Sequence, residues 1–412
     1  MSTSQDNLTG STQNAAPPLW RNRDFLLLWS GQSVSSLGTG ISSLALPLLI
    51  LALTGSPTIA GLVSGAGSLI YFILTLPAGA LADRWDRKRV MIICNALLGL
   101  NMASIPVALL IGHLTITQLF INSLVSGACT IFLYVAEKAS LPRVVTKQQL
   151  PQAMAQYEAS ESAITLVSPS LGGILYSLAR AVPFVADAVS DLLLTIALLF
   201  IKQEFQQERT TARQELFSEI REGIVWLWRH PLLRSMTLLM AGLFFVLAFG
   251  DELPLIVVAQ SHGATPAIIG LIFAADGVGG LLGAFCAPWF QKRYRIGHII
   301  IGIHWGFALL WPLYALAPNA LLLGAIGIVV GFIDQIHDVT WISYRIGLIP
   351  DALQGRVTST YRLISRSLRP AGLALSGICI QHIGAPQTFL VAAACLVVLA
   401  VLTTLSRDVR RA

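Results

Sequence analysis

The chain has 412 residues, of which 55% are hydrophobic and only 12% are charged, and its formal net charge is +6. An ordinary soluble domain is about a quarter charged and about half apolar, so this composition excludes a soluble globular protein. Several nearly uncharged windows exceed the roughly 18 residues needed to cross a hydrocarbon core of about 30 Å. These windows do not alternate in polarity as the strands of a membrane β-barrel would. The sequence therefore predicts an all-α polytopic membrane protein.

The N-terminal 22 residues are polar and lack the basic segment followed by an apolar segment that marks a secretory signal. We interpret residues 1–22 as a disordered cytoplasmic tail. The rest of the chain contains twelve predicted membrane helices, at about 24–52, 58–82, 90–111, 116–137, 153–178, 182–201, 232–259, 266–290, 297–317, 320–346, 357–381 and 386–406. Glycine and proline occur inside many of them, which membrane helices tolerate because neighbouring helices satisfy the freed backbone groups.

Lys and Arg residues are concentrated in the connections on one side of these helices. That side holds the N-terminal tail, the 83–89 turn and the C-terminal residues 407–412, whereas the opposite connections contain a single basic residue, Arg180. By the positive-inside rule, both termini and the 83–89 turn are cytoplasmic. The sequence thus predicts a multi-pass protein of the cell inner (plasma) membrane, and the placement of its basic residues disfavours a nucleic-acid partner.

The connection 202–231 is the longest one inside the chain and separates two halves, 23–201 and 232–412. Its second part is amphipathic at helical spacing, which is typical of a helix that lies in the membrane interface. A plain tether fits the same position equally well.

The two halves resemble each other. The sequence SPTIAGL at 56–62 matches TPAIIGL at 265–271, an offset of 209 residues, and 168–173 corresponds to 369–374 at an offset of 201. Six plus six helices repeated in the same orientation predict two pseudo-symmetric six-helix bundles, the architecture of an alternating-access carrier.

The turn between the second and third helices concentrates charge, because six of the seven residues 83–89 in GALADRWDRKR (79–89) are ionisable. The simplest interpretation is a cytoplasmic anchor that cannot enter lipid.

The order Gly-x-Leu-Ala-Asp-Arg-x-x-Arg-Lys-Arg in a twelve-helix chain also closely resembles the signature of the Major Facilitator Superfamily. Asp86 stands where that family usually has a glycine. This form of the motif, together with the segment PDALQGRV at 350–357, resembles the branch that contains macrolide-efflux proteins and the enterobactin exporter.

The resemblance implies a conformational latch on the cytoplasmic side that holds the outward-open state. Asp83 would face the start of the eleventh helix, whose free N–H groups favour an anion. Arg87 would pair with Glu137, and Gly79 would allow close approach of the second helix to the eleventh. The residues assigned to this latch are Gly79, Asp83, Arg84, Arg87, Lys88, Arg89 and Glu137.

The fifth helix carries Ser168, Pro169, Gly172 and Gly173, which resemble the antiporter signature G-P-x-x-G-G with Ser168 in place of the first glycine. Small residues and a proline bend allow close helix contact in lipid, and such spacing occurs in most membrane bundles. Within the resembled family the motif favours export over uptake. The fourth helix lacks the arginine that drug:proton antiporters carry there, so their proton coupling cannot simply be transferred.

Ionisable groups inside membrane spans are costly and usually line a cavity or pair with one another. Asp251 and Glu252 in the seventh helix and Asp276 in the eighth are candidates for an acidic, apolar cavity wall that binds an organic cation or exchanges protons. A solvated cap at the outer edge is the alternative for the seventh-helix acids. Asp187, near the start of the sixth helix, is interpreted as a packing or capping residue.

A second set of ionisable groups lies in the tenth and eleventh helices. Arg362, Arg366 and Arg369 repeat at i, i+4 and i+7 and form one stripe, while Asp334 and Asp338 repeat at i, i+4 on the preceding helix. Their similar depth in the membrane predicts that the two sets pair. The pairs would form either a structural salt-bridge network or a network that responds to protons or substrate.

No phosphate-binding loop, HExxH or GxSxG motif occurs, and the five cysteines are dispersed in apolar tracts. The sequence therefore does not indicate an enzyme, a cofactor or a metal site.

The favoured hypothesis is a monomeric secondary transporter in the lipid bilayer that exports hydrophobic or amphipathic drugs in exchange for protons, driven by the proton motive force. The alternatives are an exporter of an endogenous siderophore, secondary metabolite or lipid, and a non-transporting receptor or scaffold.

Overall fold

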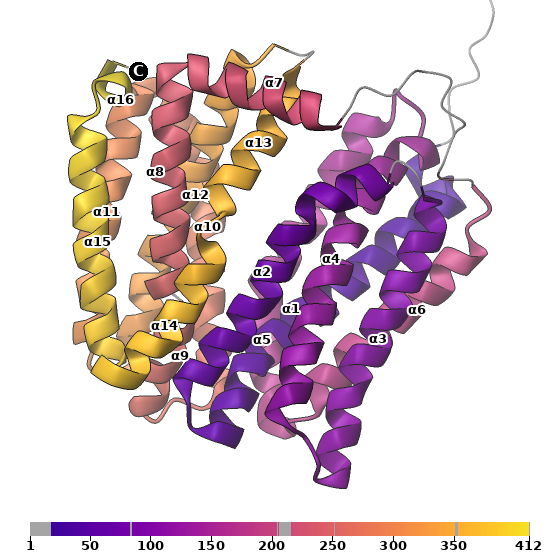
Figure 1. Cartoon of the computed structure of the whole chain (residues 1–412). Helices are drawn as coiled ribbons and strands as arrows, with labels where there is room; N and C mark the ends of the chain where they lie inside the picture. Colours follow the sequence, from indigo (N-terminus) through magenta and orange to yellow (C-terminus); the bar gives the residue numbers. More distant parts are fainter. Residues whose placement is uncertain are drawn as a thin grey trace, which may run out of the picture.

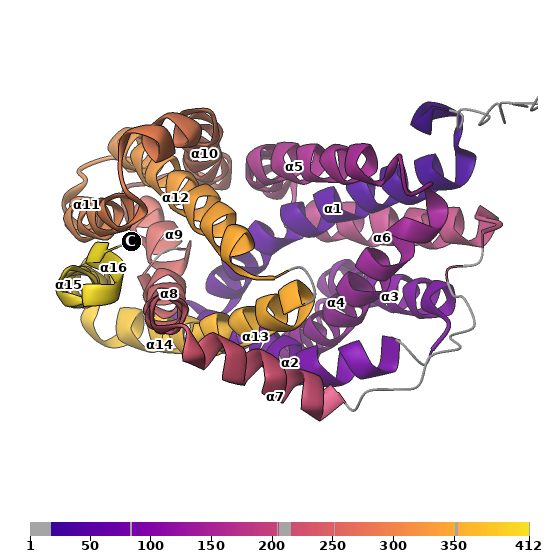
Figure 2. The same ribbon diagram turned by 90° about the horizontal axis from the view of Figure 1, so that it is seen from above.

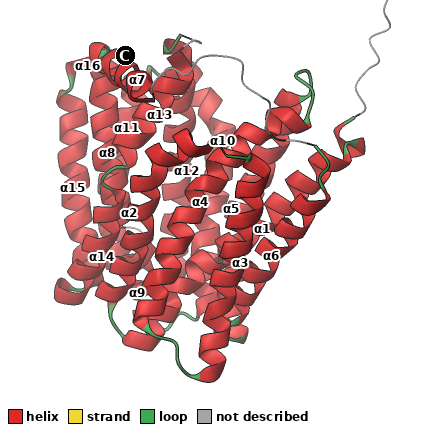
Figure 3. Cartoon of the chain, turned by 45° about the vertical axis from the view of Figure 1, so that its right-hand side comes forward, coloured by secondary structure: helices red, strands yellow, loops and turns green. Residues whose placement is uncertain are grey.

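The computed structural model describes residues 18–82, 85–203, 205, 216–250, 252–350 and 353–411. In this part of the chain, helices alternate with short loops and there is no strand (Figure 3). The helices are η1 (Leu19–Arg21), α1 (Arg23–Thr54), α2 (Pro57–Ala82), α3 (Arg87–Ile111), α4 (Ile116–Val144), α5 (Leu150–Leu178), α6 (Val182–Phe200), α7 (Leu216–Arg229), α8 (Pro231–Gly250), α9 (Glu252–Ser261), α10 (Pro266–Arg293), α11 (Ile296–Leu316), α12 (Ala320–Leu348), α13 (Gln354–Arg366), α14 (Arg369–Ile383), α15 (Ala385–Leu405) and α16 (Arg407–Arg411).

Ten helical spans in the described residues are long and apolar enough to cross a membrane, with α8 and α9 together forming one of them. The other two predicted spans are α5, which contains Glu158 and Glu161, and the consecutive helices α13 and α14, which contain the arginine stripe. The two acids lower the hydropathy of α5, and α13 and α14, with 13 and 15 residues, are each too short to cross a membrane alone. The predicted all-α polytopic architecture is confirmed.

The eleventh predicted helix is interrupted. Its first segment, α13, ends at Arg366, four residues before Pro370. A proline ring clashes with the carbonyl group four residues earlier and supplies no N–H group. The interruption therefore lies where a proline disfavours the preceding turn.

Helices α1 to α6 pack into one bundle and α8 to α15 into a second (Figures 1 and 2). In the first bundle, α1 packs against α5 and α6, α2 against α4, and α3 against α4 and α6. In the second, α10 packs against α12, α11 against α15, and α8 against α14. The two bundles thus have corresponding contacts, as the internal sequence repeat predicts.

The amphipathic part of the long connection is helix α7, which lies against α13 and α8 at the end of the molecule that also holds the C-terminus (Figure 1). A Cβ atom at Gly223 would lie 2.8 Å from the carbonyl oxygen of Arg356, so α7 and α13 are in close contact. Glu222 also forms an ion pair with Arg356. The helix is therefore packed onto the second bundle and does not serve only as a tether.

The two bundles contact each other mainly through two helix pairs, α2 with α14 and α5 with α10. The ribbons diverge toward the end that holds α7 and the C-terminus (Figure 1). We call this the open end, and the opposite end, where α2 meets α14 and α5 meets α10, the closed end.

Candidate functional site

The first contact at the closed end joins α2 to α14 through glycines. A Cβ atom at Gly377 would lie 2.2 Å from the carbonyl oxygen of Pro57 and 3.0 Å from the Cα atom of Gly61. Small residues allow membrane helices to approach until their backbones touch, and van der Waals packing then stabilises the contact. Ser56 adds a polar contact between the bundles by donating a hydrogen bond of 3.1 Å to Gln381.

The second contact at the closed end joins α5 to α10 in the same way. A Cβ atom at Gly173 would lie 2.2 Å from the carbonyl oxygen of Pro266, and one at Gly270 would lie 2.4 Å from that of Pro169. Pro266 and Gly270 are the counterparts of Pro57 and Gly61 at the offset of 209 residues. The sequence repeat therefore places one proline and one glycine at each of two pseudo-symmetric contacts.

The remaining residues of the fifth-helix motif face α1. A Cβ atom at Gly172 would lie 2.7 Å from the carbonyl oxygen of Ile41, and one at Gly40 would lie 2.4 Å from the hydroxyl oxygen of Ser168. The motif thus has two sides, with Pro169 and Gly173 toward the second bundle and the buried Ser168 and Gly172 toward α1. It is a packing surface between three helices.

A cavity of about 1160 Å³ lies between the bundles. Its residues come from α1, α2 and α4 on one side and from α13 and α14 on the other. The first wall is rich in hydroxyl groups, from Ser43, Ser64, Ser68, Tyr71, Thr75, Ser123, Ser126, Thr130 and Tyr134. The second wall contains Arg356, Arg362, Arg366 and Arg369. The cavity is therefore neutral and polar on one side and basic on the other.

The hydroxyl wall was not identified from the sequence, although the sequence contains a signal for it. In α2, Ser64, Ser68, Tyr71 and Thr75 follow one another at intervals of four, three and four residues. This spacing places them on one helical face. A polar stripe in an otherwise apolar membrane helix indicates a surface that does not face lipid.

The arginine stripe, which is Arg362, Arg366 and Arg369, is exposed to the cavity. Arg362 donates a hydrogen bond across the cavity to the hydroxyl group of Tyr134, and its guanidinium carbon lies 5.8 Å from the centre of that ring. The guanidinium carbon of Arg366 lies 5.7 Å from the ring centre of Phe244. These contacts are to neutral groups, so they leave the positive charge of both residues uncompensated.

The acids predicted to pair with this stripe do not line the cavity. Asp338 is half exposed and lies 3.6 Å from His337 on the same helix, and Asp334 is partly buried on α12. Neither is among the residues that line the cavity. The cation near Asp338 on α12 is Arg345, a buried residue whose guanidinium carbon lies 4.1 Å from the ring centre of Tyr361.

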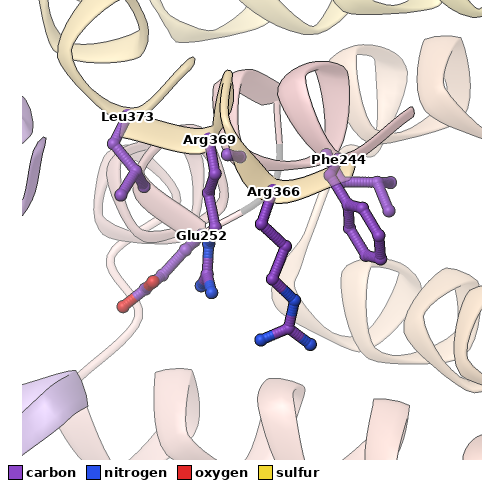
Figure 4. Close-up of a pocket in the computed structure, with 7 residues that line it drawn as sticks. Phe244, Glu252, Arg366, Arg369 and Leu373 are labelled. Carbon is purple, nitrogen blue, oxygen red and sulfur yellow. The ribbon is translucent and has the colours of Figure 1, made fainter. Parts of the chain in front are cut away.

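The predicted acidic wall also differs from the observed arrangement. Glu252 lines a side pocket of about 210 Å³ together with Phe244, Arg366 and Arg369 (Figure 4). Asp276 lies in the contact between α10 and α12, where a Cβ atom at Gly331 would lie 2.9 Å from its carboxylate. Asp251 lies outside the described residues. Among the described residues that line the two pockets, Glu252 is the only acid, and the other charged residues are all arginines.

The predicted latch is at the open end. Asp83 and Arg84 lie outside the described residues. Arg87 donates a hydrogen bond of 2.9 Å to the carbonyl oxygen of Ala139, and Lys88 donates one to the carbonyl oxygen of Ile201. Both bonds hold the start of α3 to elements of its own bundle.

The other latch residues are described in the same region. Arg89 is exposed and lies 3.4 Å from Asp86, which is the N-cap of α3 and accepts hydrogen bonds from the N–H groups of residues 88 and 89. Glu137 is partly buried on α4. Gly79 lines the cavity, and a Cβ atom there would meet no atom within 4 Å. The predicted close approach at Gly79 is absent from this conformation because the bundles diverge at the open end.

Two buried acids lie inside the first bundle. Asp187 accepts a hydrogen bond from Ser42, and Asp191 accepts one of 2.7 Å from Ser35. These bonds join α6 to α1 and do not reach the cavity-lining surface. The packing role predicted for Asp187 agrees with this position. No group of three or more His, Cys, Asp or Glu residues in the described chain is arranged to hold a metal ion.

Residues 13–411 match a family described as transmembrane secretion effector. The chain is 26% identical over 381 residues to the multidrug efflux pump Tap of Mycolicibacterium fortuitum, which covers 89% of this chain and 91% of that protein. It is 24% identical over 396 residues to macrolide efflux protein A of Streptococcus pyogenes, which covers 94% and 96%.

Solved structures share the fold at low sequence identity. A point mutant of the nucleoside transporter NupG aligns with a TM-score of 0.78 at 12% identity, over 92% of this chain and 99% of that one. A bacterial homologue of the lysosomal transporter Spinster, in an inward-facing and occupied conformation, aligns with a TM-score of 0.76 at 13% identity, over 96% and 98%. The two-bundle fold predicted from the sequence is therefore confirmed.

Proposed function

Because this chain belongs to the transmembrane secretion effector family of the Major Facilitator Superfamily, we propose that it exports hydrophobic or amphipathic small molecules by alternating access. The observation that carries the proposal is the cavity of about 1160 Å³ between two bundles that touch at one end and diverge at the other. Efflux by the relatives Tap and macrolide efflux protein A supports the outward direction. A receptor or scaffold would not need such a cavity.

In this proposal, the positions of the basic connections determine which end of the protein faces the cytoplasm. The start of α3, helix α7 and the C-terminal helix α16 lie at the open end. By the positive-inside rule this end faces the cytoplasm of a cell bounded by the inner (plasma) membrane. The described conformation is then inward-open, ready to take up cargo from the cytoplasm or from the inner leaflet.

Export requires the closed end to separate while the open end closes. The contacts of Gly377 and Gly173 involve backbone atoms and small side chains, with no ion pair among the described residues of these contacts. They can be broken without exposing a buried charge. At the open end, the latch of Asp83 and Arg87 would form in the outward-open state and bring α2 toward α13 at Gly79.

We assign the proton-exchanging group to Glu252. It is the only acid among the described pocket-lining residues, and it lies in the side pocket with Arg366 and Arg369. Cargo bound near these arginines would change the electrostatic potential at Glu252, and therefore the affinity of its carboxylate for a proton. Coupling to the proton motive force needs no bound cofactor.

Transport into inside-out membrane vesicles tests this proposal. Expression in an efflux-deficient host should raise the tolerance of that host to at least one compound of a broad panel. In the vesicles, an acidic interior should drive accumulation of that compound. Glu252→Gln should abolish the dependence on the gradient, whereas Glu158→Gln, an exposed carboxylate on α5 outside the pockets, should not. Accumulation that is independent of the pH gradient in the wild type would contradict proton antiport.

Export of an endogenous product, such as a siderophore or another secreted metabolite, is the second candidate. The basic cavity wall favours it, because many secreted chelators and acids carry negative charge. Unchanged tolerance across the panel, together with accumulation of a metabolite in a deletion strain, would support this candidate over drug efflux.

A further inference from the structure

The charge inside the cavity is one-sided. The three arginines of the stripe are exposed to it, and Glu252 is the only carboxylate among the described residues that line the cavity and its side pocket. Even with Glu252 ionised, these four groups carry a net charge of +2 by their formal charges. The wall from the first bundle does not offset this charge, because its polar side chains are hydroxyl groups and phenols.

The observed contacts of the arginine stripe use only part of its hydrogen-bond donors. Arg362 reaches the neutral hydroxyl group of Tyr134, and Arg366 lies over the ring of Phe244. Each guanidinium has five N–H donors in a planar fork, and a hydroxyl or an aromatic ring uses only part of them. A carboxylate or another oxyanion would satisfy the remaining donors with charge-assisted, bidentate hydrogen bonds.

The opposite wall is suited to the same kind of ligand. Tyr71 lies within electrostatic reach of all three arginines and of Tyr134, so both phenols face the positive charge across the cavity. Phenol and serine hydroxyls can donate hydrogen bonds to an anion. Phe72, Leu76 and Ile131 add apolar surface to the first wall, which can receive the hydrophobic part of a ligand.

An organic cation would fit this cavity poorly. It would have to enter beside three guanidinium groups, and juxtaposing like charges in a partly desolvated site is unfavourable. The cavity therefore discriminates by charge, through attraction of anions and repulsion of cations.

We propose that the cavity binds an amphipathic organic anion, with its acidic oxygen atoms at the arginine stripe and its apolar part against α2 and α4. This inference names the class of cargo and rests on the proposed export function only for the direction of movement. It replaces the organic cation expected from the sequence, because Asp276 lies away from the lining surface and Glu252 shares its pocket with two arginines.

A pair of dyes with the same xanthene core tests the inference. Carboxyfluorescein is anionic and rhodamine 123 is cationic, and binding of each to the purified full chain in detergent is measured by fluorescence anisotropy. Carboxyfluorescein should bind saturably and rhodamine 123 at least about tenfold more weakly, as expected for one charged hydrogen-bonding group at about 1.5–3 kcal/mol. Equal binding, preference for rhodamine 123, or no saturable binding of carboxyfluorescein would overturn the inference.

Variants then locate the bound anion. Arg366→Gln should weaken carboxyfluorescein about tenfold or more, while Arg366→Lys should retain part of the affinity because the charge remains. Arg180→Gln removes the same charge from an exposed position outside the cavity and should leave binding unchanged. If Arg366→Gln and Arg180→Gln have the same effect, the stripe is not the binding site. A gel-filtration profile like that of the wild type shows that each variant is folded.

The inference and the export function fail in different ways. If carboxyfluorescein binds through the arginine stripe but a pH gradient does not drive its accumulation in inside-out vesicles, the inference stands and proton-driven export fails. If a cationic compound is accumulated while carboxyfluorescein does not bind, export stands and the inference is overturned.

Discussion

The two ends of the interface between the bundles are built from different chemistry. At the closed end, Gly377 and Gly173 bring backbones into contact, and the described contacts are uncharged. At the open end, the cavity is lined by arginines and hydroxyl groups. The closed end therefore depends on the absence of side-chain volume, whereas the open end depends on the placement of charge. A methyl group should disturb the first, and a change of charge or hydrogen bonding the second.

A common measurement can follow both ends. Ser56 lies at the contact between α2 and α14, where it donates a hydrogen bond to Gln381. Ser56→Cys should therefore react with a membrane-impermeant maleimide faster whenever the closed end separates. The labelling rate reports the balance between the inward-open and outward-open conformations, and each variant below is compared in this background.

The largest effect is expected from Gly377→Val. Its Cβ atom would lie 2.2 Å from the carbonyl oxygen of Pro57, a distance that forces α2 and α14 apart. Overpacking of this kind costs about 1–3 kcal/mol, which corresponds to about a 5- to 150-fold shift of a conformational equilibrium. Labelling at position 56 should rise and transport should fall. Gly302→Val is the control, because a Cβ atom at Gly302 meets no atom within 4 Å.

A shift of opposite sign is expected from Gly79→Leu. Gly79 has open space around it in the described conformation, so the substitution should not disturb this state. If the open end closes through contact of α2 with α13, the added side chain obstructs closure. Labelling at position 56 should then fall, and transport should decrease several-fold with the folded fraction unchanged. Wild-type labelling and transport in Gly79→Leu would contradict the latch at this position.

A smaller effect is expected from Tyr134→Phe. The phenol accepts a hydrogen bond from Arg362 and so joins the two bundles across the cavity, while the ring itself remains after substitution. Loss of one hydrogen bond costs about 0.5–1.5 kcal/mol, so labelling at position 56 should rise about two- to tenfold. Thr130→Val, which removes another hydroxyl of the same wall, is the control, and an equal response of the two variants would show that this bond does not hold the bundles.

The smallest effect is expected from Glu222→Gln. The ion pair of Glu222 with Arg356 joins α7 to α13, and the side chain of Glu222 is 50% exposed. Exposed ion pairs contribute about 0–1 kcal/mol, and this one lies between α7 and the second bundle alone. Labelling at position 56 should change less than about threefold. A larger change would show that α7 controls the open end, which would make the connection between the bundles a regulatory element.

Much of the fold follows from local properties of the sequence. Apolar windows predict where helices cross the membrane, because any uncovered peptide group in lipid is costly. The offset of 209 residues predicted that Pro57 and Gly61 correspond to Pro266 and Gly270, and these residues occupy equivalent contacts. The arginine stripe also follows from helical periodicity alone. The polar face of α2 was equally available in the sequence and was missed.

Other features depend on which helices meet. Pro370 follows an interruption, whereas Pro47 and Pro106 lie inside the continuous helices α1 and α3, so proline by itself does not determine where a helix ends. The difference arises from the neighbouring helices that do or do not satisfy the freed backbone groups. Asp338 does not line the cavity that the stripe lines for a related reason, since equal depth in the membrane does not place two side chains on the same surface.

The sequence by itself determined the membrane spans, the side that carries the basic connections, the two-fold repeat and the family. Each of these is a property of segments or of short motifs, and hydrophobicity, charge and periodicity are sufficient to specify it. Only the tertiary structure decided that the cavity wall is basic, that Asp276 lies between helices, and that the bundles touch at the glycine contacts while the open end is apart. These features depend on the rotation and tilt of each helix against its neighbours, which are set by packing between distant segments.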